Sequence, residues 1–96
     1  MQSYKKIDLI FDKSDKIYDF HFPGNPVVPG ALIIGKCKEI IEKEENCRIS
    51  KAEKFRFGVF VKPDKCLLKW VCEGKKIKII LEQFDKKAVS GVFYAK

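Results

Sequence analysis

The chain has 96 residues, which is enough for one domain with a single hydrophobic core and too few for two. Its 46% hydrophobic and 34% charged residues are typical of a soluble globular protein and exclude a disordered, collagen-like or membrane-spanning chain. The formal net charge of +7 favours an acidic partner such as nucleic acid, anionic lipid or an acidic carrier protein, although a lysine-rich surface that only keeps the domain soluble explains it equally well.

The four cysteines do not form a metal or redox motif. No two of them stand in a C-x-x-C pair, so we expect no metal site and no cofactor, and we interpret them as buried free thiols: Cys37, Cys47, Cys66 and Cys72. No apolar segment is long enough to span a bilayer, and the N-terminus has no run that resembles a signal peptide. We therefore expect a cytoplasmic protein without a membrane partner.

The N-terminal third predicts a strand and then a rigid loop. Ile7, Leu9 and Phe11 alternate with more polar residues, as in a half-buried strand, and a short edge strand is possible at residues 16–20. Residues 21–30 hold three of the four prolines and two of the six glycines, so they form neither helix nor central strand.

A helix is predicted from Gly30 to about Glu45. Its apolar stripe has spacings of one, three and four: Ile33, Ile34, Cys37, Ile40 and Ile41. The first turn is apolar all round and the last turns are charged, so we expect the N-terminal half to enter the core and the C-terminal half to emerge into water.

The remainder predicts strands joined by short turns. Phe55, Phe57, Val59 and Val61 share one face of a strand, and Pro63-Asp64-Lys65 makes a turn. The next strand carries Cys66, Leu68, Trp70 and Cys72 on one face. The strand after it carries Ile77, Ile79 and Leu81 on one face. Gly74 marks a hairpin, and Asp85-Lys86-Lys87 turns into the last strand, residues 88–95.

This order predicts a single α+β domain over residues 1–96, in which an antiparallel sheet wraps around one helix. The helix is the one element that can cover the apolar face of the sheet. Exposed strand edges also favour pairing between copies, so we expect a homodimer or a higher even oligomer.

His21 is the first candidate for chemistry. It is the one histidine of the chain, it opens the proline-rich loop, and imidazole has a pKa suited to proton transfer near neutral pH. At the end of the loop, Pro29 suits a first helical turn, yet no Ser, Thr or Asp precedes it as a cap. Free amides there can polarise a thioester carbonyl, and Gly30 would admit the substrate closely; a proline-stiffened turn with solvated amides is the alternative.

The string His21-Phe22-Pro23-Gly24-Asn25-Pro26-Val27-Val28-Pro29-Gly30 resembles the H-F-P-G-x-P-x-x-P-G signature of the bacterial 3-hydroxyacyl-ACP dehydratases. Residues 54–64 are similar to that family's strand ending in a Pro-Gly-Asp turn, here without the glycine. The resemblance implies a hot-dog fold, an obligate dimer with sites at the interface, and an acyl tunnel along the helix. It further implies that His21 takes the α-proton of a 3-hydroxyacyl thioester on acyl carrier protein or coenzyme A and that the Gly30 amide binds the thioester oxygen. The other implied substrate-binding residues are Phe22, Pro29, Ala31 and Gly35.

One departure from the family concerns the second catalytic group. Family members carry an Asp or Glu on the helix, contributed by the other subunit, fourteen positions after the histidine; Gly35 occupies that position here. Three hypotheses follow: Glu39, one turn further along, supplies the carboxylate; His21 acts with water, in dehydration or in hydrolysis as a thioesterase; or the chain binds acyl thioesters or partners a complete subunit.

Partner hypotheses follow from charge. An acidic acyl carrier protein would suit the basic surface, and Arg56, Lys86 and Lys87 are the residues we expect to bind it. A nucleic-acid module built on Lys54, Arg56 and Lys62 would explain the charge but not the proline loop, so we do not expect nucleic acid as a partner.

Overall fold

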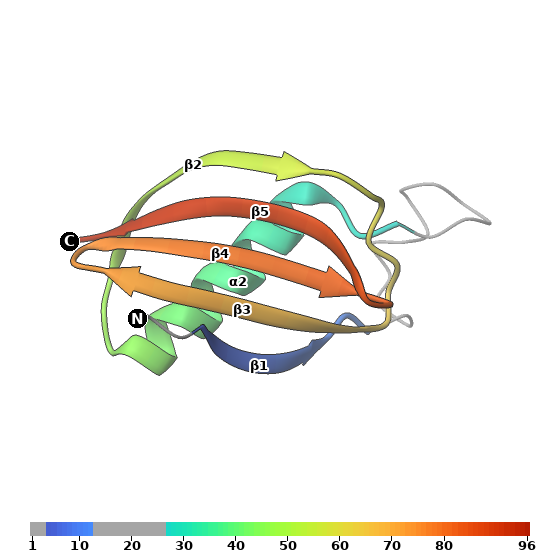
Figure 1. The fold of residues 1–96 in the computed structure, drawn as a ribbon, viewed down its shortest axis with the longest axis horizontal. Helices are drawn as coiled ribbons and strands as arrows, with labels where there is room; N and C mark the ends of the chain where they lie inside the picture. The colour runs from blue at the N-terminus through green and yellow to red at the C-terminus, as the bar shows by residue number, and fades with distance from the viewer. Residues whose placement is uncertain (1–3, 13–26) are drawn as a thin grey trace.

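The structure is a computed structural model that describes residues 4–12 and 27–96. Its elements are β1 (Lys5–Ile10), α2 (Gly30–Glu45), β2 (Ile49–Phe57), β3 (Lys65–Glu73), β4 (Lys76–Gln83) and β5 (Lys86–Ala95). The strands form one antiparallel sheet in the order β1-β3-β4-β5-β2, and α2 lies across one face of it (Figure 1). The expected α+β architecture is therefore confirmed for the described residues, and a single chain does not test the expected dimer.

The helix has the predicted bounds but buries a longer face than predicted. Its buried residues are Ile33, Cys37 and Ile41, each four positions from the next, so one stripe faces the sheet along nearly the whole helix. The expectation that only the N-terminal half enters the core is wrong, because Ile41 is as fully buried as Ile33. The helix ends at Asn46, whose left-handed backbone lets its amide bond the Glu42 carbonyl.

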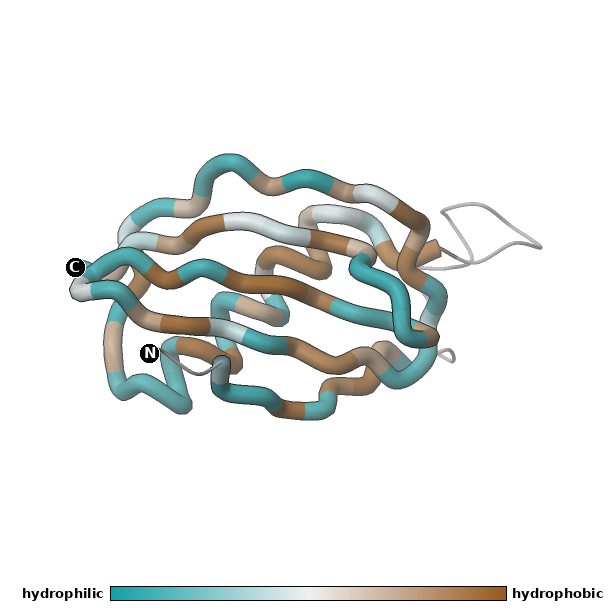
Figure 2. Tube along the Cα trace, viewed as in Figure 1, coloured by the Kyte–Doolittle hydropathy of each residue, from teal (hydrophilic) through white to brown (hydrophobic). Residues whose placement is uncertain are grey.

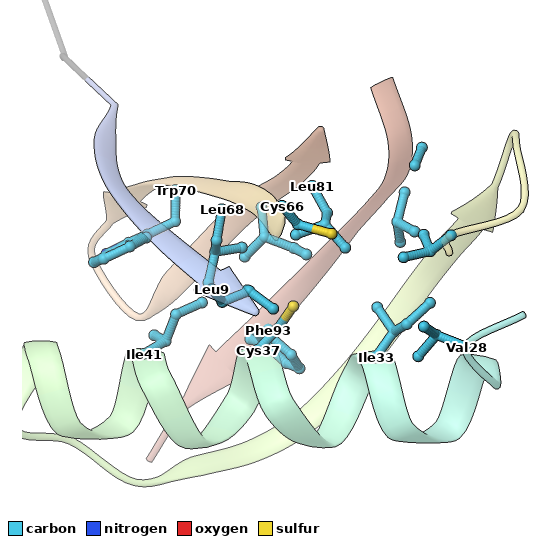
Figure 3. Close-up of a cluster of buried hydrophobic side chains, with 14 of the residues drawn as sticks. Leu9, Val28, Ile33, Cys37, Ile41, Cys66, Leu68, Trp70, Leu81 and Phe93 are labelled. Atoms are coloured by element: carbon cyan, nitrogen blue, oxygen red, sulfur yellow. The ribbon is translucent and has the colours of Figure 1, made fainter. Parts of the chain in front are cut away.

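The inner faces of the central strands meet this stripe. Buried and half-buried residues alternate along β4 without interruption, as the period of two requires. Hydropathy is less regular, since Ile79, Ile80 and Leu81 are apolar in succession, and hydrophobic stretches run along the central strands (Figure 2). Leu68, Trp70 and Phe93 project from the sheet toward α2 (Figure 3). The predicted inner faces of β3 and β4 are thereby confirmed, with Gly74 in the hairpin between them at φ 63°.

Strand β2 differs from its prediction at both ends. It begins at Ile49 and ends at Phe57, so Val59 and Val61 lie outside it. The strand ends there because the Gly58 and Val59 amides both point to the Ala88 carbonyl, at 2.7 and 3.5 Å, and the chain then leaves the sheet.

A bulge precedes that end. The register with β5 shifts between Glu53 and Arg56, and Lys54 within the shift has φ 58°. Phe55 also lies within the shift, and its ring lies directly on Gly91, where a Cβ would come within 2.6 Å of it. Gly91 is therefore required for close packing, and the Phe55 ring also lies 5.2 Å from the ring of Phe93.

The turn before β5 is one residue earlier than predicted. Phe84 and Asp85 form it, with φ 52° and 62°, and Lys86 already belongs to the strand. Two consecutive positive φ values are typical of a type I′ hairpin turn, which matches the twist of the sheet.

The helix in the described part of the chain is too short and too polar to cross a bilayer.

Candidate active site

The N-terminal end of α2 lies at the same end of the molecule as the C-terminal end of β2 and the β4–β5 turn (Figure 1). Pro29 is the N-cap residue, its backbone is extended, and no side-chain cap hydrogen bond forms within the described residues. The Pro29 carbonyl accepts from the amides of Leu32 and Ile33, at 3.0 and 3.1 Å. Within residues 4–12 and 27–96, no acceptor bonds the amides of Gly30 and Ala31, and the first turn carries no acidic side chain. Two amides at the positive end of the helix thus have no acceptor among the described residues, and such amides can bind an oxygen of partial negative charge.

The helix start is fixed by residues 58–64, which we call the connector. Its Val61 carbonyl accepts from the Val28 amide at 2.8 Å, directly before the helix. Val28 and Val61 are both buried in the core, so this bond is shielded from water. At its end, the Asp64 carbonyl accepts from the Phe11 amide at 3.2 Å.

Gln83 is the buried polar residue that fastens the connector to β4. Its Oε1 accepts from the Lys62 amide at 2.8 Å, and its Nε2 donates to the Lys62 carbonyl at 2.9 Å. The same Nε2 lies 3.4 Å from Sγ of Cys66. Gln83 thus satisfies both backbone groups of one connector residue, and through Val61 it supports the position of the helix start.

Phe57 is the side chain closest to Gly30. A Cβ placed on Gly30 would lie 3.0 Å from Cζ and 3.2 Å from Cε1 of the Phe57 ring. The ring is nevertheless 48% exposed, so only one part of it is covered by the helix start. Glycine at position 30 therefore makes room for an aromatic ring as well as for a ligand, which the sequence analysis did not foresee.

The sequence-predicted site residues fall into two groups. His21 and Phe22 lie outside the described residues, so their predicted roles are not tested. Pro29 and Gly30 are half-buried at the helix start, and Ala31 beside them is exposed.

Gly35 and Glu39 lie one turn apart on α2, and both are exposed. A Cβ on Gly35 would meet no atom within 4 Å. A side chain at this position would therefore point out of the protomer, away from the core that α2 forms with its own sheet. The position is open to a neighbouring subunit.

The basic residues predicted to bind a carrier lie near this end of the sheet. Arg56 and Lys87 line one groove of about 220 Å³, together with Gly58. Lys86 lines a second groove, of about 180 Å³, with Lys62, Phe60 and Phe84. Phe60 and Phe84 are the two most exposed aromatic side chains in the described segments. The structure thus places Lys62 and Lys86 beside exposed aromatic rings, and Arg56 with Lys87 in a separate groove.

The cysteines lie away from the helix start. All four are free; Cys37 and Cys66 are buried, whereas Cys47 and Cys72 are only half-buried, which corrects the expectation that all are buried. Burial raises the pKa of the Cys37 thiol to about 12 and that of Cys66 to about 11. Both therefore stay protonated and pack as small apolar groups. No cluster of metal-ligating side chains occurs in the described part of the chain.

Comparison with solved structures supports a hot-dog-like fold. A chain of the dehydratase heterocomplex ApeI:P from Xenorhabdus doucetiae aligns with a TM-score of 0.80 and 21% identity, over 99% of this chain and 88% of that one. An uncharacterized protein from Erwinia carotovora subsp. atroseptica aligns with a TM-score of 0.71 and 17% identity, over 99% of this chain and 84% of that one. No curated protein sequence matches the chain significantly.

The family assignment comes from the sequence as a whole. The family model of the ApeI-like proteins, described as ApeI dehydratase, matches residues 2–92. This match includes the proline-rich loop, the helix and nearly the whole sheet. The chain therefore belongs to the ApeI-like dehydratase family.

Proposed function

We propose that this chain is a subunit of a 3-hydroxyacyl-thioester dehydratase, with His21 as the base and the Gly30 amide at the thioester oxygen. The observation that carries the proposal is the helix start at the end of the His21 to Gly30 motif, where the amides of Gly30 and Ala31 have no acceptor within the described residues. Membership of the ApeI-like dehydratase family supports it.

The proposed reaction removes water from C2 and C3 of the acyl group. His21 takes a proton from C2, and the electron pair moves toward the thioester oxygen, where the amides of Gly30 and Ala31 stabilise the developing charge. The pair then forms the C2–C3 double bond as the C3–O bond breaks. The departing hydroxyl needs a proton to leave as water, so a second acidic group is required.

We propose that a partner subunit supplies this second group. Gly35 occupies the helix position of the family carboxylate and cannot donate a proton. Because this position is exposed and open, what it carries is presented to a neighbour and not to the protomer's own core. A dehydratase of this family has been described as a heterocomplex, ApeI:P, which supports a partner of different sequence for this chain. Glu39, exposed one turn further along α2, is the alternative donor within the chain.

We further propose that the acyl group arrives on acyl carrier protein. Lys62 and Lys86 line a groove with the exposed residues Phe60 and Phe84, and Arg56 and Lys87 line a second groove. An acidic carrier protein complements this surface, and the net charge of +7 adds long-range attraction. Coenzyme A thioesters, which are also anionic, are the second candidate.

A second candidate function is non-catalytic binding of acyl thioesters, and it is favoured by Gly35. Hydrolysis of the thioester, with His21 activating a water molecule, is the third. Both retain the free amides as the thioester-binding group, and neither needs a helix carboxylate.

The Gly35→Glu variant separates these functions. Hydration of a 2-enoyl thioester, the reverse of dehydration, should rise about 10²–10⁴-fold when the carboxylate is restored, and adding His21→Ala should abolish the gain. Gly35→Gln is the matched control, because it adds the same bulk without an ionisable group. A stable Gly35→Glu protein with no gain would contradict the dehydratase proposal. Release of free thiol by the natural chain would favour hydrolysis.

A further inference from the structure

The ring of Phe57 forms an apolar surface beside the helix start, whose first two amides have no acceptor within the described residues. Its Cζ lies 3.0 Å from the position of a Gly30 Cβ, so the ring edge is in contact with the backbone of the first helical residue. Phe57 is 48% exposed, and Val59 and Phe60, two and three residues further along the chain, are exposed as well. Aromatic surface left open beside a set of polar donors is a common feature of sites for apolar ligands.

The backbone around Phe57 holds the ring in this place. Phe57 pairs with Val89 at the end of β2, and the next residue, Gly58, donates to the Ala88 carbonyl at 2.7 Å. The bulge at Lys54 sets the register of this last part of the strand. The contact with Gly30 thus rests on strand pairing and not on a freely moving side chain.

We infer that Phe57 selects the acyl group of the substrate, an inference that rests on the proposed function. An oxygen held at the Gly30 amide lies within a few ångströms of the Phe57 ring. The carbon chain attached to that thioester therefore passes the exposed part of the ring. Contact with the ring removes apolar surface of both partners from water, so longer or broader acyl groups gain affinity that short ones do not.

The test measures binding to the natural chain by NMR. The probes are two pantetheine amides that mimic 3-hydroxyacyl thioesters but do not react, one with a four-carbon and one with an eight-carbon acyl group. We expect both to shift the amide signals of Gly30 and Ala31, and the longer one to bind more tightly. Phe57→Ala should reduce the preference for the longer chain by about fivefold or more, through loss of affinity for the longer probe.

Two further variants control the test. Phe57→Leu keeps an apolar side chain of smaller contact area and should lose an intermediate part of the preference, so it carries the test if Phe57→Ala does not fold. Tyr4→Ala removes an aromatic ring that is 41% exposed near the start of β1, and should leave the preference unchanged.

The outcomes separate the inference from the proposed function. An unchanged chain-length preference in a folded Phe57 variant would overturn the inference. If such a variant also dissociates into monomers, the ring is assigned to a contact between subunits. If the natural chain binds neither probe at Gly30 and Ala31, the proposed function itself is wrong. In the catalytically restored Gly35→Glu protein, the same loss of preference should appear in KM for 2-enoyl thioesters, with kcat nearly unchanged.

Discussion

Replacing Gln83 by leucine tests whether the connector holds the helix start in place. Gln83 is 5% exposed and makes two hydrogen bonds to the Lys62 backbone, at 2.8 and 2.9 Å. A net loss of about 1 kcal/mol for each bond gives about 2 kcal/mol. A Lys62 backbone group that is left without a partner adds to this loss of unfolding free energy. Because Lys62 is exposed, water replaces part of the lost bonding, so the total loss is no more than about 4 kcal/mol.

Urea unfolding followed by circular dichroism measures this loss in the free energy of unfolding. A loss of this size is a large part of the roughly 5–15 kcal/mol that stabilises a small domain. Glu82→Ala is the matched control on the neighbouring residue, because its half-exposed ion pair with Lys69, at 3.0 Å, is worth less than about 1 kcal/mol. A Gln83→Leu protein that loses less than about 1 kcal/mol would refute the role given to Gln83.

Three further predictions concern α2, the thiols and acid stability. Gly35→Ala should stabilise the protein by about 1 kcal/mol, seen as a higher Tm, because a Cβ there meets no atom and glycine is a poor helix former; a lower Tm would contradict the open position. At pH 8, Cys37 and Cys66 should resist iodoacetamide in the folded protein, because burial raises the pKa of both thiols, and mass spectrometry should find them alkylated only in urea. Hydrogen bonds from Lys5, at 2.6 Å, and Trp70, at 2.8 Å, lower the pKa of Glu45 below 4.5, so its contribution to stability is complete above pH 4.5 and is lost as the pH falls through the folded pKa. Glu45→Gln should therefore flatten the acid side of the curve of unfolding free energy against pH, measured by urea unfolding. An unchanged curve would be inconsistent with the ion pair.

Local sequence patterns predicted most of the fold. The bounds of α2 follow from an apolar stripe whose spacing fits a helix, and the inner faces of β3 and β4 follow from apolar residues at every second position. The end of β2 was not predictable, because alternation continues through Val59 and Val61, whereas the Val61 carbonyl accepts from the Val28 amide beside the helix start.

The candidate site was predictable only in part. Proline and glycine spacing marked the helix start, and the absence of a capping side chain suggested its free amides. The contact of Phe57 with Gly30 joins residues far apart in the sequence, and nothing local to either one indicates it. Gln83 gave a weak signal, since it is a polar residue in phase with the buried positions Ile79 and Leu81. The role of His21 remains a prediction, because that residue lies outside the described part of the chain.

The central claim is that this chain supplies the histidine half of a site and needs a carboxylate from its partner. Mixing the natural chain with a His21→Ala, Gly35→Glu double variant tests it directly, after unfolding and refolding together so that subunits exchange. In the proposed dimer, neither chain alone forms a complete site, since one lacks the carboxylate and the other lacks the base. The mixed dimer has one site with His21 from one subunit and Glu at position 35 from the other. We predict that hydration of a 2-enoyl thioester appears only in the mixture and is greatest at equal amounts; a mixture no more active than its two components would contradict the account.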